Sequence, residues 1–108
     1  IVIHKNKFMD FFSFNDFIKV VKMYMEVESH YLNKTFDCCY SKKYTLFDVA
    51  NIINNLDSYK VNIITLDDSG MDESYTGECI LRYDLNYKGL ENSIKNMFTG
   101  LKNKFDIL

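Results

Sequence analysis

Two runs of side chains between residues 59 and 85 are typical of β-strands, and this pattern constrains the fold most. Residues 59–66, YKVNIITL, are rich in β-branched side chains. Residues 75–85 alternate, with Tyr75, Cys79, Leu81, Tyr83 and Leu85 on one face and Thr76, Glu78, Arg82 and Asp84 on the other. Because Gly70 lies between the two runs, the pattern predicts an antiparallel β-hairpin. An isolated hairpin is barely stable in water, so helices must cover it.

Three segments show the three-and-four spacing of amphipathic helices, and they are 14–32, 46–56 and 89–105. Thr45, with Asp48 three residues later, is a variant capping box at the start of the second segment. The predicted fold class is α+β, with helices packed on a small antiparallel sheet built around the hairpin, in the order α-α-β-β-α. Extra short strands are considered at 1–8 and 35–40.

The length of 108 residues predicts a single α+β domain over 1–108. Because Met9 is the first methionine, residues 1–8 are read either as a short strand or as a non-native extension. The side chains predicted to form the core are Phe17, Val21, Tyr24, Ile53, Val61, Ile63, Cys79, Leu81, Ile94, Phe98 and Leu101.

Charge and composition argue against several classes of function. The net charge is −2 and Arg82 is the single arginine, which disfavours direct nucleic-acid binding. No apolar run approaches the ~20 residues that span a bilayer, and the first residues lack a signal-peptide layout, so we expect a cytoplasmic protein. The favoured residues (Phe, Tyr, Met, Ile, Asn and Lys) have AT-rich codons, which suggests a phage or other mobile element, or an AT-rich virus or parasite.

The acidic stretch LDDSGMDESYTGE, residues 66–78, resembles a metal site in composition only. A calcium loop that starts at Asp67 would need a glycine in sixth place, where Asp72 stands. Asp, Ser and Gly are common in hairpin connections because they favour turns. The stretch is therefore read as the polar tip of the hairpin, and no metal or other cofactor is predicted.

Cys38 and Cys39 are the only candidates for a catalytic group, with Asp37 before them and His30 as a conceivable base. The spacing fits no zinc motif. Free cysteines are among the most buried residue types. An odd total of three cysteines indicates reduced thiols rather than a disulfide framework, and His30 at a helix end suits the helix dipole.

One face of the predicted hairpin is a candidate binding surface. If the helices cover the other face, Ile64, Leu66 and Ile80 form an apolar patch with a polar rim, which is how interaction surfaces are built. The predicted protein-binding residues, patch and acidic loop together, are Ile64, Leu66, Asp67, Asp68, Asp72, Glu73, Glu78, Ile80 and Arg82. In the alternative, a helix or the N-terminal segment folds over this face.

The sequence contains no motif that defines a reaction. The favoured hypothesis is a small non-enzymatic protein-binding, regulatory or inhibitor protein, whose partner is a protein of the host machinery or a second copy. The alternatives are a structural or assembly subunit of a virus or complex, and a thiol-dependent enzyme that uses Cys38 or Cys39 with His30.

Overall fold

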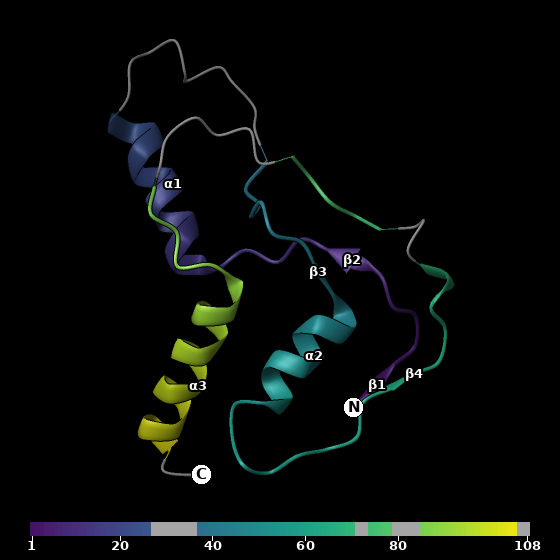
Figure 1. Cartoon of the computed structure of the whole chain (residues 1–108). Helices are drawn as coiled ribbons and strands as arrows, with labels where there is room; N and C mark the ends of the chain where they lie inside the picture. Colours follow the sequence, from purple (N-terminus) through teal and green to yellow (C-terminus); the bar gives the residue numbers. More distant parts are fainter. Residues whose placement is uncertain (27–36, 71–73, 79–84, 106–108) are drawn as a thin grey trace.

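The computed structural model of the chain describes residues 1–26, 37–70, 74–78 and 85–105. These residues form a mixed α+β structure with three helices and four two-residue strands (Figure 1). The elements, in chain order, are β1 (Val2–Ile3), β2 (Phe8–Met9), α1 (Phe14–Glu26), β3 (Tyr44–Thr45), α2 (Leu46–Asn54), β4 (Ile64–Thr65) and α3 (Leu90–Phe105).

The helices lie where the sequence predicts them. The capping box of α2 is present: the Asp48 N–H donates to Thr45 Oγ1 at 3.0 Å, and the Thr45 N–H donates to Asp48 Oδ2 at 2.9 Å. The observed bounds of α2 and α3 confirm the predictions to within two residues at each end. Helix α1 is confirmed over Phe14–Glu26, and the rest of its predicted span, 27–32, lies outside the described residues.

The strands pair differently from the prediction. β1 pairs in parallel with β4, and β2 pairs antiparallel with β3. The predicted hairpin between 59–66 and 75–85 is not confirmed. β4 instead pairs along one edge with the N-terminal segment, where the N–H groups of Ile64 and Leu66 donate to the carbonyls of Ile1 and Ile3, both at 2.9 Å.

The outer segments of the predicted hairpin also find other neighbours. Tyr75 bridges Met9 of β2 in parallel, while 79–84 lie outside the described residues. The short strand considered at 1–8 is present as β1 and the first residue of β2. At 37–40 the described chain has no strand, and the strand of that region, β3, lies a few residues later.

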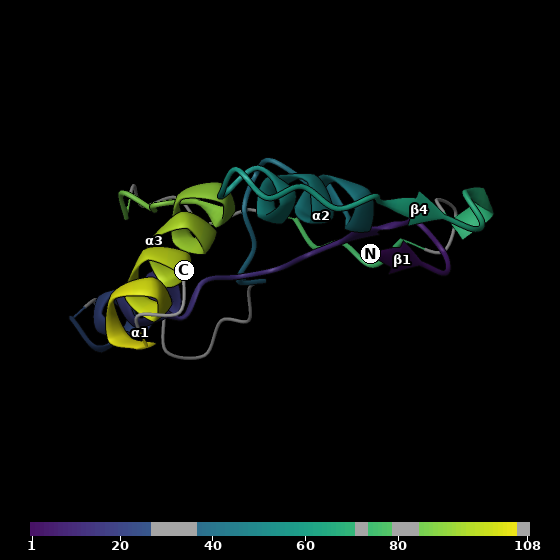
Figure 2. The same ribbon diagram turned by 90° about the horizontal axis from the view of Figure 1, so that it is seen from below.

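The molecule is flat. Its principal extents are 50 × 39 × 17 Å, and its radius of gyration is 16.7 Å, whereas a compact chain of about 100 residues has roughly 13 Å. Figure 2 shows α1 and α3 at one end of the plate and β1 and β4 at the other. A plate this thin can bury few side chains.

The core is accordingly small, and it differs from the predicted one. The buried apolar side chains among the described residues are Ile3, Val20, Met23, Cys39, Tyr40, Ala50 and Leu90. The prediction was wrong for four side chains that are 40% to 49% exposed, namely Phe17, Val21, Ile53 and Leu101. Five predicted core residues are half-buried, and these are Tyr24, Val61, Ile63, Ile94 and Phe98. Cys79 and Leu81 lie outside the described residues.

The error in α1 has a simple cause. The helix buries the face of Asp16, Val20 and Met23, not the predicted stripe through Phe17 and Val21. Both faces are spaced three and four residues apart, so periodicity permits either one. The buried carboxylate of Asp16, which hydropathy places on the outside, decides which face turns inward.

Candidate functional site

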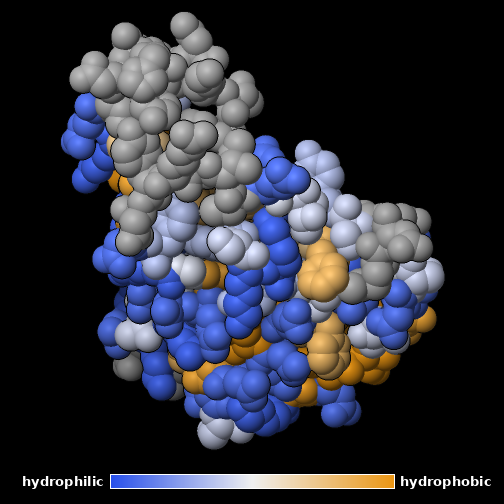
Figure 3. Space-filling view, turned by 45° about the horizontal axis from the view of Figure 1, so that its top comes forward, coloured by the Kyte–Doolittle hydropathy of each residue, from blue (hydrophilic) through white to orange (hydrophobic). Residues whose placement is uncertain are grey.

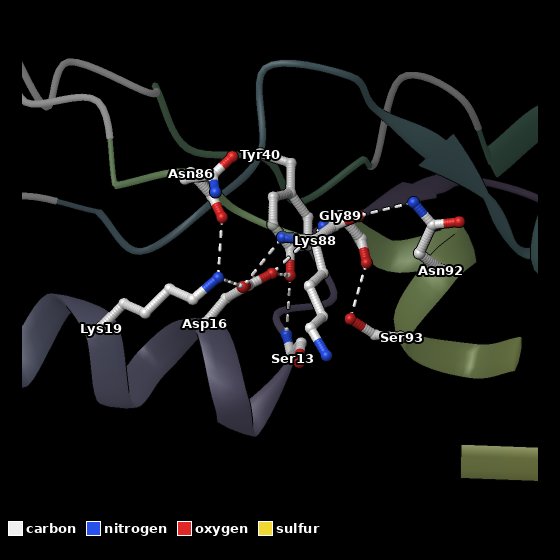
Figure 4. Close-up of polar contacts among 9 residues, drawn as sticks. All are labelled: Ser13, Asp16, Lys19, Tyr40, Asn86, Lys88, Gly89, Asn92 and Ser93. Carbon is white, nitrogen blue, oxygen red and sulfur yellow. Dashed lines mark hydrogen bonds and ion pairs between the residues drawn. The ribbon is translucent and has the colours of Figure 1, made fainter. Parts of the chain in front are cut away.

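The densest polar arrangement centres on Asp16, at the first turn of α1 (Figure 4). Its carboxylate accepts hydrogen bonds from the Tyr40 hydroxyl, from the Lys88 N–H at 3.0 Å and from the Gly89 N–H at 3.2 Å. Lys19 Nζ lies 3.3 Å from Oδ1. One side chain thus connects α1, the segment before β3 and the start of α3.

The surroundings of Asp16 shift two pKa values. Burial by itself would raise the pKa of Asp16, but the hydrogen bonds from Tyr40, Lys88, Gly89 and Lys19 lower it below its usual value. Burial and the adjacent carboxylate raise the pKa of Tyr40 to about 12. At neutral pH the pair is therefore a carboxylate that accepts from a neutral phenol.

The Asp16 arrangement has the properties of a structural connection. The Asp16 side chain is 0% exposed, so a substrate cannot reach it. Its charge lies at the N-terminus of α3, where the helix dipole favours an anion. The rings of Phe12, Tyr40 and Tyr87 pack beside it, with centroids 4.7 to 5.7 Å apart. The arrangement holds the two helix N-termini together with little apolar burial.

The candidate thiol site lies near an open hollow of about 520 Å³ lined in part by Asp10, Asp37, Cys38 and Gly77. The Asp10 carboxylate accepts hydrogen bonds from Lys43 Nζ at 2.8 Å and from the Gly77 N–H. Burial and the charge of Asp37 raise the pKa of Cys38, which disfavours the reactive thiolate.

The other members of the predicted thiol site are Cys39 and His30. Cys39 is buried, with 2% of its surface exposed. His30, the predicted base, lies outside the described residues. Among the described residues, no group of three or more His, Cys, Asp or Glu side chains could hold a metal ion.

The predicted binding residues Ile64, in β4, and Leu66, directly after it, come to the surface together. Ile64 is 51% exposed and Leu66 is 61% exposed. Val2, which pairs with Ile64 across the sheet, is 54% exposed. Paired residues of parallel strands, and residues two apart on one strand, share a face. Val2, Ile64 and Leu66 therefore form one apolar surface, called here the β4 patch. In Figure 3 apolar side chains reach the surface at the lower right, the region of β1 and β4.

The predicted acidic residues divide between two places. Asp67 and Asp68 are exposed and follow the β4 patch directly in the chain. Hydrogen bonds from Ser69 lower the pKa of Asp67. Glu78 belongs to the segment 74–78, which runs beside β2, and its N–H donates to Asp37 Oδ2 at 3.2 Å. The remaining predicted binding residues lie outside the described chain, and these are Asp72, Glu73, Ile80 and Arg82.

A second exposed apolar surface was not predicted. Phe14, Phe17, Val21 and Met25 are all exposed along α1 and form what we call the α1 stripe. Its first residue, Phe14, also lines an open hollow of about 800 Å³ shared with α3. The wide apolar arc of this segment was the available signal, because a helix that is apolar on two sides needs two partners.

Comparison of the chain with protein-family models, with curated proteins and with solved structures found no match. None of the helices in the described part combines the length and apolar character that crossing a bilayer requires.

Proposed function

We propose that this chain is a small non-enzymatic binding protein that contacts a protein partner through the β4 patch and the adjacent Asp67 and Asp68. The observation that carries this proposal is the joint exposure of Val2, Ile64 and Leu66 on one face of a sheet. An apolar centre beside acidic side chains has the composition of a protein–protein contact.

The energy available at the β4 patch suits a reversible contact. Fully burying an aliphatic side chain contributes about 1.5–3 kcal/mol relative to full exposure. The three side chains are about half exposed, so completing their burial contributes roughly 1 kcal/mol each. The partner must therefore add hydrogen bonds or charge contacts at the rim, where the two carboxylates stand.

Two features favour binding over catalysis. The raised pKa of Cys38 opposes thiolate formation. The carboxylate with the most perturbed surroundings, Asp16, is enclosed and has its hydrogen-bond partners within the fold. A regulatory or inhibitory protein that acts by covering a surface of its target needs no reactive group.

A structural or assembly subunit is the second candidate, and the α1 stripe favours it. A subunit inside a larger complex contacts more than one neighbour. The stripe lies at the end of the plate opposite β1 and β4 (Figure 2). One protein that uses both surfaces would bridge two partners.

The test is a comparison of Ile64→Glu with Tyr75→Glu. Both side chains are exposed, but Tyr75 lies outside the β4 patch. Each tagged variant is used to purify partners from cells in which the protein is naturally made. We expect wild type and Tyr75→Glu to retain the same stoichiometric partner and Ile64→Glu to lose it, with melting temperatures within about 2 °C of one another. Equal retention by Ile64→Glu would contradict the proposal, and unfolding of this variant would show that Ile64 belongs to the core.

The same purification separates the two candidate functions. Met25→Glu changes the exposed α1 stripe and leaves the β4 patch intact. Loss of a second, different partner in Met25→Glu would favour the assembly subunit. An unchanged set of partners would favour the single binding surface.

A further inference from the structure

The outer edge of β4 carries main-chain groups without partners in the described chain. On the side of β1, the N–H groups of Ile64 and Leu66 donate to the carbonyls of Ile1 and Ile3, and the carbonyl of Asn62 accepts from the Ile1 nitrogen at 2.8 Å. Main-chain groups alternate sides along a strand. The N–H and C=O groups of Ile63 and Thr65 therefore point away from β1, and no described residue bonds to them. β4 also lies at the margin of the molecule (Figure 1).

An open strand edge is a template for another strand. We propose that the edge of β4 pairs antiparallel with β4 of a second copy of this chain, about a two-fold axis at Ile64. This inference rests on the proposed binding function and names the partner of the same surface. The product is a continuous four-stranded sheet, in the order β1, β4, then β4 and β1 of the second copy.

The pairing satisfies the free groups symmetrically. With Ile64 opposite Ile64 of the second copy, Ile63 stands opposite Thr65 of the other chain, and the reverse holds as well. Residues whose main-chain groups point towards each other exchange two hydrogen bonds, so the two equivalent pairs form four. The two Ile64 side chains then stand on the same face as a non-hydrogen-bonded pair, in which side chains approach most closely.

Charge supports a second copy over an unrelated strand. β4 spans Ile64–Thr65, with Lys60 shortly before it and Asp68 shortly after it. An antiparallel pairing about Ile64 brings the end of one chain that carries Lys60 to the end of the other that carries Asp68, once on each side of the axis. Both side chains are exposed. Lys60 Nζ donates to the Asn54 carbonyl at 2.9 Å and to the Asp57 carbonyl at 2.8 Å. An ammonium has three donors, so one N–H stays available for the carboxylate.

The expected dimer is weak. A contact of about five residues per strand buries less than the ~800 Å² per partner of a standard interface. We expect a dissociation constant roughly in the micromolar to millimolar range. Self-association this weak would leave the β4 patch accessible to another partner at low concentrations of the chain.

The test is sedimentation equilibrium of the full chain over a wide range of concentrations. Thr65→Pro removes an outward N–H, while the inward donors, Ile64 and Leu66, keep theirs. Thr65→Val is the matched control, because it changes the side chain and keeps the N–H. We expect wild type and Thr65→Val to dimerise and Thr65→Pro to weaken the dimer at least tenfold. A wild-type chain that stays monomeric at about 1 mM, or a Thr65→Pro dimer of wild-type strength, would overturn the proposal.

A charge exchange tests the register and is independent of the proline variant, should that variant fail to fold. Asp68→Lys should weaken the dimer, and adding Lys60→Asp in the same chain should restore it. Failure of the double variant to recover would overturn the pairing centred on Ile64. If wild type is monomeric while Ile64→Glu still loses another protein, self-pairing fails and the proposed function stands.

Discussion

Replacing Asp16 by alanine should destabilise the fold more than any surface substitution, because three donors lose one acceptor. The Tyr40 hydroxyl and the N–H groups of Lys88 and Gly89 all point at this carboxylate. Removing one partner from a buried charged network costs about 3–5 kcal/mol. Lys88 is exposed, so water can replace part of its bond, and we expect about 3 kcal/mol, the lower end of that range. A domain of this size has a total stability of roughly 5–15 kcal/mol.

Two companion variants separate charge from shape. Asp16→Asn keeps the shape and one acceptor oxygen but directs an amide donor at other donors, so we expect a loss of about 2 kcal/mol. Lys95→Ala removes an exposed ion pair with Glu91 at 3.3 Å. Exposed pairs of this spacing contribute about 0.3–0.5 kcal/mol, so this variant measures the effect of an ordinary surface change.

Acid titration gives the same side chain a second signature. The folded-state pKa of Asp16 lies below its value in the unfolded chain. The stability that this difference contributes is present above the unfolded pKa, near 4, and is lost as the pH falls through the lower folded pKa. The advantage of wild type over Asp16→Asn should therefore hold from neutral pH down to about pH 4 and decrease at lower pH.

The measurement is urea unfolding followed by circular dichroism, with linear extrapolation to zero denaturant. Unfolding free energies of wild type and the three variants are compared at pH 7 and at pH 3. A loss below 1 kcal/mol for Asp16→Ala at pH 7 would refute the reasoning, because it would mean that the carboxylate is replaceable by water. An advantage over Asp16→Asn that does not change with pH would refute the electrostatic part alone.

Two further predictions concern neighbouring contacts. The pKa of Tyr40 is raised from 10 to about 12. The stability that this shift contributes, about 3 kcal/mol, is complete below pH 10 and is lost as the pH rises towards 12. Over this interval the unfolding free energy of Tyr40→Phe should fall less than that of wild type, and an equal fall in both proteins would contradict the assignment. Thr45→Ala removes the cap of α2 and should lower the unfolding free energy by about 1 kcal/mol. The control is Thr99→Ala at an exposed position in the middle of α3, which should change the unfolding free energy by less than about 0.5 kcal/mol. An unchanged unfolding free energy in Thr45→Ala would count against the capping box.

The helices could be predicted from sequence because their signals are local. The capping box of Thr45 and Asp48 joins two residues only three apart, and it appears as expected. The alternation along β4 was equally informative: Ile64 and Leu66 are exposed, while Val61 and Ile63 are half-buried. Local period thus gave the exposed face of the candidate site, although only Ile64–Thr65 of the predicted strand 59–66 forms a strand.

The strand pairing could not be predicted in the same way. β4 pairs with β1, more than 60 residues earlier, and the choice between β1 and a later strand depends on contacts across the whole chain. Turn chemistry around Gly70 favoured the nearer strand. Gly70 is instead buried, and a Cβ atom there would lie 2.7 Å from the Asn6 carbonyl oxygen. The glycine therefore permits a close approach between the N-terminal segment and the chain after β4.

The role of Asp16 gave no sequence signal beyond its place in the first turn of α1. Its partners, Tyr40, Lys88 and Gly89, lie 24 to 73 residues away. A polar residue with distant partners looks like a surface residue in a hydropathy pattern. Because the distant partners of Asp16 could not be recognised in the sequence, the prediction chose the wrong buried face of α1, the one through Phe17 and Val21.

The way this fold is held together bears on what it can bind. A charged network around Asp16 fixes the helix N-termini through hydrogen bonds, and an aromatic cluster covers that network. The apolar side chains of α1 and β4 are therefore not all needed inside, and the plate exposes both the α1 stripe and the β4 patch. Exposed apolar surface is kept from water by association. Such surfaces at two ends of a thin molecule support the proposed binding of other proteins, and the proposed pairing at the open edge of β4 would add the directional hydrogen bonds that a purely apolar contact lacks.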